Sequence, residues 1–148
     1  MVSLVNSETE KIEVKLQWKE KMKVLTFIRD FNSITMDDHK KGDNSAPSPL
    51  EIFLSSVGAC LIMLFIHCLN LSNIHINPED FNLKIAGYLG RVNERLRITE
   101  VEAEFIIQSK NNNSKIQRCF KKFQLFCILS ESIQAGIRFT NELKIINK

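Results

Sequence analysis

Charged residues are absent from a long stretch in the middle of the chain. No Asp, Glu, Lys or Arg occurs from Ile52 to Pro78, although the 148-residue chain is 25% charged overall. A helix of about 20 apolar residues can cross a bilayer, so a membrane span is one interpretation of this stretch. The other is a helix buried on every side, as occurs in protein cores. A chain of this length can hardly surround such a helix, so the second interpretation favours a homodimer that does not enter a membrane.

Features of several other protein classes are also absent. The net charge is only +3 and no long run of Lys or Arg occurs, so nothing in the charge pattern favours nucleic-acid binding. The amino terminus has no basic segment followed by a long apolar one, so no signal peptide is predicted. The expected compartment is therefore the cytoplasm, where structural disulfides are rare.

The cysteines do not follow a metal-binding pattern. The four cysteines are Cys60, Cys68, Cys119 and Cys127. No two of them form the Cys-x-x-Cys pair of zinc ribbons and thioredoxin-like sites, and the three histidines add no ligand spacing. Neither a metal nor another cofactor is expected. The cysteines are therefore packing residues or redox-active thiols, and Cys68 and Cys119 are interpreted as small buried hydrophobes.

Hydrophobic periodicity predicts an α+β fold. Alternation of apolar and polar residues predicts strands, and apolar residues at a spacing of three to four predict helices. The predicted strands are 11–20, 22–29, 31–37, 81–89, 97–109 and 137–145, and the predicted helices are 50–71, 115–126 and 128–134. The acidic alternation of strand 97–109 indicates an antiparallel sheet with one wet face. With no repeat and no linker, the order β-β-β-α-β-β-α-α-β predicts one domain over residues 1–148.

Local signals mark where some of these elements begin and end. Ser48 followed by Pro49 is typical of a helix N-cap and first helical position. Gly136 is expected to end helix 128–134. Gly90 and the segment 92–95, VNER, predict the turn between the two long strands.

Two motifs resemble those of the OsmC/Ohr family, the osmotically inducible and organic hydroperoxide resistance proteins. The first is PSPLEIFLSSVGAC, in which Pro49, Glu51 and Cys60 match the family pattern. The second is FCILSESIQAGI, in which Cys127, Ser130 and Gly136 match more loosely. The predicted order of elements also matches, so the resemblance covers nearly the whole chain. The spacing P-x-E is similar to that of the OsmC-like branch.

The resemblance implies a fold and a chemistry. The implied fold is OsmC-like, with curved antiparallel sheets around a long central helix in an intertwined homodimer. The implied activity is a thiol-dependent peroxidase in which Cys60 is the peroxidatic cysteine and Cys127 the resolving cysteine. Its partners would be a small-molecule peroxide and a dithiol reductant. The alternative is a non-catalytic relative that binds an apolar small molecule at the dimer interface, because Leu50 stands where the peroxidases have an acid.

Cys60 is expected to need a neighbouring cation in order to become a thiolate. It lies about three turns into its helix, too far from the N-terminus for the helix dipole to lower its pKa, and apolar burial raises a thiol pKa. An Arg held by a carboxylate is therefore expected beside it, and Arg29 and Glu51 are the predicted candidates. If the helix includes Glu51, its carboxylate points away from Cys60, nine positions later. The candidate apolar walls for an organic peroxide are Phe53, Leu61, Met63 and Leu64.

Overall fold

A computed structural model describes residues 10–110 and 113–144, which belong to two compact units, Met1–Ile52 and Phe53–Lys148. The predicted α+β class is confirmed, with three α-helices and two antiparallel sheets among these residues. The organisation of residues 1–148 as one domain stays a prediction.

The unit Met1–Ile52 contains a three-stranded antiparallel sheet in the order β1-β2-β3. Its strands are β1 (Lys15–Glu20), β2 (Lys23–Phe27) and β3 (Ile34–Met36). All three were predicted, but each is shorter than its predicted range. Lys15 pairs with Phe27, the last residue of β2, so residues 11–14 have no partner strand in this sheet among the described residues. A strand needs such a partner for its backbone hydrogen bonds, which explains why β1 does not begin at residue 11.

The loop that leads into the long helix is organised by a buried carboxylate. Asp37 is only 1% exposed and accepts hydrogen bonds from the backbone N–H groups of Ser45, Asp43 and Asp38 and from the Ser45 hydroxyl. These donors, first of all the Ser45 amide, lower the pKa of Asp37 despite its burial. The loop therefore has a defined path from β3 to the helix start.

The long helix α1 (Pro49–Leu71) begins where the sequence predicts. The Ser48 carbonyl accepts the first helical bond from Ile52 at 3.0 Å, and the Ser48 hydroxyl accepts from the Glu51 amide at 3.3 Å. The Glu51 carboxylate in turn accepts from the Ser48 amide at 2.7 Å. This reciprocal pair is a capping box, and it confirms Ser48 as the N-cap.

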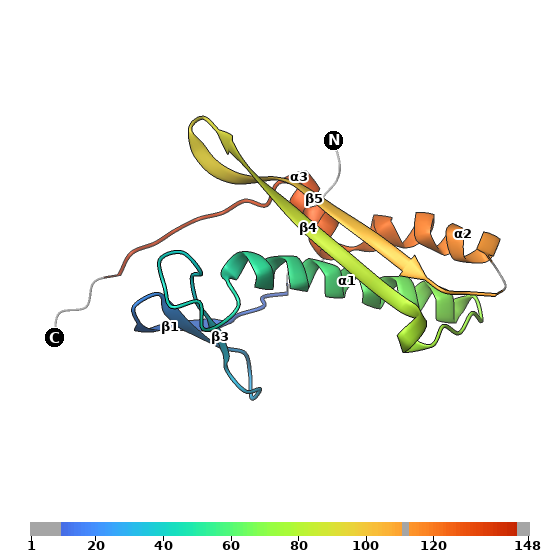
Figure 1. The fold of residues 1–148 in the computed structure, drawn as a ribbon, viewed down its shortest axis with the longest axis horizontal. Coiled ribbons are helices and arrows are strands. Elements are labelled where there is room, and N and C mark those ends of the chain that lie inside the picture. The colour runs from blue at the N-terminus through green and yellow to red at the C-terminus, as the bar shows by residue number, and fades with distance from the viewer. Residues whose placement is uncertain (1–9, 111–112, 145–148) are drawn as a thin grey trace. The chain divides into compact units, whose positions relative to one another are not determined.

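The unit Phe53–Lys148 is built on the remainder of α1. Its other elements are η1 (Pro78–Asp80), β4 (Phe81–Val92), β5 (Arg95–Ile107), α2 (Asn113–Phe123), η2 (Gln124–Phe126) and α3 (Ile128–Ala135). Strands β4 and β5 form one long antiparallel hairpin, which lies alongside α1 and α2 in Figure 1. Gly58 permits the close approach of α1 to β4, because a Cβ there would lie 3.3 Å from a Leu83 methyl group.

An aromatic cluster joins α1, the hairpin and α2. Phe65 of α1 stacks on Phe123 of α2 with ring centroids 4.7 Å apart, and it meets Phe105 of β5 edge-on at 5.5 Å. Aromatic pairs of this kind contribute about 0.5–1.5 kcal/mol beyond the burial of their surface. The cluster therefore holds the two helices in a defined register, which matters for the cysteines that both helices carry.

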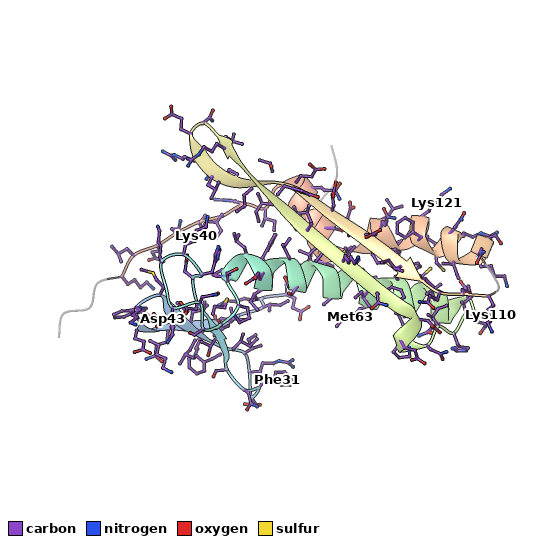
Figure 2. All side chains as sticks on the ribbon, viewed as in Figure 1. Phe31, Lys40, Asp43, Met63, Lys110 and Lys121 are labelled. Carbon is purple, nitrogen blue, oxygen red and sulfur yellow. The ribbon has the colours of Figure 1, made fainter. Side chains whose placement is uncertain are left out.

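One face of α1 is buried and much of the rest is exposed. Val57, Leu61, Phe65 and Leu69 recur every four residues and form the buried stripe. Met63, labelled in Figure 2, is 71% exposed. By length and composition alone, α1 is also the helix of the described chain that could cross a membrane, with a mean hydropathy of 2.3 in its apolar window.

The hairpin turn lies within the predicted segment 92–95 but does not include Gly90. Gly90 remains within β4, paired with Arg97, and the strands continue to the pair Val92 and Arg95. The turn consists of Asn93 and Glu94 alone, and both have positive φ angles, 50° and 64°. A two-residue hairpin turn of type I′ requires this conformation, which Asn adopts readily. The prediction that Gly90 forms part of the turn is therefore wrong.

The predicted last strand is also wrong over the residues that the structure describes. Residues 137–144 follow α3 without strand structure, and Ile145 lies outside the described residues. The apolar side chains that motivated the prediction, Ile137, Phe139 and Leu143, are each more than two-thirds exposed. Alternation creates a strand only where a neighbouring strand completes its backbone hydrogen bonds, and no strand pairs with this segment in the described chain.

The helices near the carboxyl end match their predictions with small differences. Helix α2 ends at Phe123, and its predicted last turn tightens into η2, as is common at helix ends. Cys127 is the N-cap of α3, and Gly136, with φ of 76°, follows its last residue as expected.

Candidate functional site

The structure brings Cys60 and Cys127 together. Cys60 lies about three turns after the start of α1 and Cys127 caps α3, and their sulfur atoms are 3.4 Å apart. Both thiols are free. A disulfide requires a sulfur separation of about 2.05 Å, so a small movement suffices to join them. Because Cys60 is half-buried and Cys127 is fully buried, Cys60 is the sulfur that a small molecule reaches more easily.

Cys127 has an environment that favours its thiolate. Burial acts to raise its pKa, but hydrogen bonds from the Ser130 hydroxyl and amide, from the Cys60 thiol and from the Leu129 amide outweigh burial and lower it. The Ser130 amide lies 3.5 Å from the Cys127 sulfur. A cysteine at a helix N-terminus is a position where thiolates are commonly stabilised.

The environment of Cys60 disfavours its thiolate. Burial is the main cause that raises the pKa of Cys60, and the hydrogen bond and negative charge of Cys127 raise it further. The amides of Leu129 and Ile128 act in the other direction without reversing the shift. When the pair carries one proton, that proton therefore resides on Cys60 and the negative charge on Cys127.

A hollow of about 820 Å³ lies within the same unit, and although neither Cys60 nor Cys127 lines it, several of their neighbours do. Its lining includes Val57 and Leu61, which flank Cys60 on α1, and Ser130, which bonds to Cys127. Of the predicted apolar walls, Phe53 and Leu61 line the hollow, whereas Leu64 packs against the core. Its size is within the range of small-molecule sites. Ser130 belongs to the second sequence motif, whereas Val57, three positions before Cys60, was not predicted as a site residue.

The Glu51 carboxylate accepts a hydrogen bond at the start of α1. The helix includes Glu51, so the condition under which its carboxylate points away from Cys60 is met. The backbone amide of Ser48 is the main cause that lowers the pKa of Glu51, so the carboxylate is ionised as it caps the helix. Its predicted role in supporting the thiolate stays a prediction.

Arg29 lies in the other unit, in the turn that follows β2. It is exposed, its φ angle is 46°, and its guanidinium carbon lies 4.7 Å from the centre of the Phe31 ring. This is the geometry of a cation–π contact. Its role as the cation that activates Cys60 stays a prediction.

A second cysteine pair was not predicted. The sulfur atoms of Cys68 on α1 and Cys119 on α2 lie 2.7 Å apart. The sequence did hold a signal: Cys68 follows Cys60 by eight residues, and Cys119 precedes Cys127 by eight. Equal spacing in opposite directions allows two antiparallel segments to bring Cys60 to Cys127 and Cys68 to Cys119 at the same time.

Within residues 10–110 and 113–144, no group of three His, Cys, Asp or Glu residues could hold a metal ion.

Solved structures share this fold. An OsmC-like protein from Mycoplasma pneumoniae superimposes with a TM-score of 0.73 at 19% identity, over 84% of this chain and 88% of that chain. An OsmC-like protein of unknown function from Vibrio cholerae gives a TM-score of 0.68 at 13% identity, over 84% and 94%. An organic hydroperoxide resistance protein OsmC from Legionella pneumophila gives 0.65 at 19%, over 86% and 92%. At these identities the likeness shows the fold alone.

The sequence itself matches a family model. No curated protein sequence matches the chain. The family model described as OsmC-like protein matches residues 42–142, about two-thirds of the chain and a range that includes both Cys60 and Cys127. The chain therefore belongs to the family of OsmC-like proteins.

Proposed function

We propose that this protein is a thiol-dependent hydroperoxide reductase that uses Cys60 and Cys127. The observation that carries the proposal is the 3.4 Å separation of the two sulfur atoms. Two free thiols at this distance can pass between dithiol and disulfide with little backbone movement. One structural neighbour, the Legionella pneumophila protein, is described as an organic hydroperoxide resistance protein, which agrees with this chemistry.

The proposed reaction has two steps. The Cys60 sulfur attacks one oxygen of the hydroperoxide, the O–O bond breaks, and an alcohol leaves with the proton of the thiol. Cys60 is then a sulfenic acid. The Cys127 sulfur attacks the Cys60 sulfur, water leaves, and a disulfide remains. An external dithiol returns both cysteines to thiols and is itself oxidised to a disulfide.

The two thiols are proposed to have different roles, because they differ in exposure and in pKa. Cys60 is the half-buried member and is the one that meets the peroxide. Cys127 holds negative charge more readily, so it can take the proton of Cys60 as that sulfur attacks and pass it to the departing alkoxide, which leaves Cys127 as a thiolate again. After the first step, the thiolate of Cys127 is already 3.4 Å from the sulfur it must attack. The pKa directions therefore suit Cys127 to the resolving role.

The hollow beside the pair supports an organic peroxide as the substrate class. Phe53, Val57 and Leu61 give it an apolar wall, and Ser130 adds a polar group on the side of Cys127. An apolar tail bound there would place a peroxide group near Cys60, since Val57 and Leu61 flank that residue along α1.

The protein is proposed to act as a homodimer in the cytoplasm, with a dithiol as reductant. A helix with as little charge as α1 would normally be covered, yet Ala59 and Met63 on one side of it are exposed. The apolar residues Ile137 and Phe139 after α3 are exposed as well. A second copy of the chain would cover such surfaces and could also supply a cation to Cys60. Neither nucleic acid nor membrane is part of the proposal.

The test is consumption of tert-butyl hydroperoxide in the presence of excess dithiothreitol. Cys60→Ser is expected to lower the rate by at least about 100-fold, since the attacking sulfur is lost. In a parallel reaction without dithiothreitol, Cys127→Ser is expected to complete one turnover and to accumulate a sulfenic acid on Cys60, detected by dimedone labelling. Cys68→Ser is the matched control and should retain the rate. An undiminished rate in Cys60→Ser would refute the proposal.

A second candidate function is supported by the same site. Burial and the Cys127 charge keep the pKa of Cys60 high, and Glu51 is engaged at the helix cap. These observations favour a non-catalytic protein that binds an apolar small molecule in the hollow. If it is correct, all four cysteines will still react with a thiol reagent after brief exposure to excess peroxide, and an apolar fluorescent probe will bind.

A further inference from the structure

We propose that Cys68 and Cys119 form a second, independent redox site, whose disulfide links α1 to α2. Their sulfur atoms are 2.7 Å apart, which is shorter than the roughly 3.5–4.0 Å at which even two carbon atoms make optimal non-bonded contact. The two thiols are free and lie on different helices, 51 positions apart in sequence. The inference does not depend on the activity proposed for Cys60 and Cys127.

The surrounding core holds these two sulfurs in place. Phe65, three residues before Cys68, stacks on Phe123, four residues after Cys119, so both cysteines lie one turn from the same ring contact. Cys119 is 3% exposed, and the Ser72 hydroxyl lies 3.4 Å from its sulfur. The pair is therefore brought together by rigid helix packing.

A disulfide fits this site better than a bound metal. Soft metals in structural sites use about four ligands, and no third His, Cys, Asp or Glu joins the pair among the described residues. Bond formation needs the sulfurs to approach from 2.7 Å to about 2.05 Å. This is a smaller movement than the Cys60–Cys127 pair requires.

The proposed oxidant of this site is a hydroperoxide, which oxidises the pair in two steps. The half-buried Cys68 thiol attacks the peroxide, an alcohol leaves, and Cys68 becomes a sulfenic acid. The Cys119 thiol then attacks the Cys68 sulfur and water leaves. Two electrons pass from the two thiols to the broken O–O bond. Burial, with the neighbouring Cys119, raises the pKa of Cys68 to about 11, so the reaction is slow near neutral pH and follows oxidation of the first pair.

The consequence is a covalent link that closes a loop containing the whole β4–β5 hairpin. Such a link restricts the unfolded chain, and a loop of this length gives a large entropic effect. The oxidised protein is therefore expected to melt roughly 10 °C higher than the reduced protein. Under excess peroxide the site would lock the helices of this unit together.

The experiment uses the full chain with Cys60→Ser and Cys127→Ser combined, so that only Cys68 and Cys119 remain as thiols. The protein is treated with excess tert-butyl hydroperoxide, blocked with N-ethylmaleimide, digested with trypsin and analysed by mass spectrometry without reduction. A disulfide joining peptide 42–84 to peptide 119–121 is expected. Recovery of both cysteines in alkylated form would overturn the proposal.

A second measurement guards against a misfolded variant. In the unsubstituted protein, a Cys60–Cys127 disulfide joins peptide 42–84 to peptide 123–138, whereas Cys68–Cys119 joins it to peptide 119–121, so the two links differ in mass. The rise in melting temperature should be reversed by dithiothreitol and should be larger in the unsubstituted protein than in Cys68→Ala, which can form only the Cys60–Cys127 disulfide. An equal rise in Cys68→Ala would overturn the proposal, whether or not the first pair is active.

Discussion

The sulfur atoms of Cys60 and Cys127 lie 3.4 Å apart, although the residues are 67 positions apart in the chain. Cys127 caps the short helix α3, whereas Cys60 lies within the long helix α1. The two positions have different effects on the thiols. The helix N-terminus stabilises a thiolate at Cys127, whereas burial keeps the proton on Cys60.

The rate of peroxide consumption is expected to rise with pH. Burial raises the pKa of Cys60, so the fraction of reactive thiolate is small at pH 7 and grows as pH passes the ordinary thiol value of about 8.5. The initial rate with tert-butyl hydroperoxide is measured at pH values below and above about 8.5. The same pH dependence is measured for a single turnover of Cys127→Ser. A rate that reaches its plateau below pH 7 would contradict this expectation and would indicate a cation beside Cys60.

Ser130→Ala is expected to raise the pKa of Cys127. The substitution removes the hydroxyl donor and keeps the backbone amide, so the thiolate loses part of its stabilisation. The thiolate ultraviolet absorbance of the Cys60→Ser form should therefore titrate at higher pH when Ser130→Ala is added. Ser132→Ala, on the same helix, serves as the control and should leave the titration unchanged. Equal titrations of the two variants would show that the hydroxyl does not act on Cys127.

Glu51→Gln is expected to keep the rate of peroxide consumption within about twofold, because Gln can replace Glu in a capping box. Ser48→Ala removes the other half of that box and should lower the free energy of unfolding by about 1 kcal/mol. Denaturant unfolding and the peroxide assay are measured for both variants. A loss of activity of tenfold or more in Glu51→Gln, with unchanged stability, would instead place Glu51 in the catalytic site.

Met63→Glu is expected to convert the proposed homodimer to a monomer. Met63 is 71% exposed in the single chain, so the substitution should be tolerated by the fold and should act on the surface that a second copy covers. Light scattering coupled to size-exclusion chromatography, without detergent, measures the mass. Leu96→Glu, an exposed apolar residue on β5 near the hairpin turn, is the control. A monomeric unsubstituted protein, or one soluble only in detergent, would contradict the dimer proposal.

Several elements could be predicted because their signals are local. The start of α1 is encoded within four residues, since Ser48 and Glu51 cap each other and Pro49 fits the first helical position. Gly136 ends α3 for a similarly local reason, its positive φ angle. The strands of both sheets were recognised from the alternation of their side chains, with errors only at their ends.

The order of the elements as far as α3, the helix caps and the presence of thiols on α1 and at the start of α3 follow from the sequence alone. Which thiols meet depends on tertiary packing, because the contact of Phe65 with Phe123 brings Cys68 to Cys119, and Cys60 meets Cys127 in the same unit. It also decided that residues 137–144 form no strand, since a strand depends on a partner that alternation alone cannot supply. Local conformation follows from neighbouring residues, whereas sulfur pairs and strand pairs depend on segments far apart in the chain.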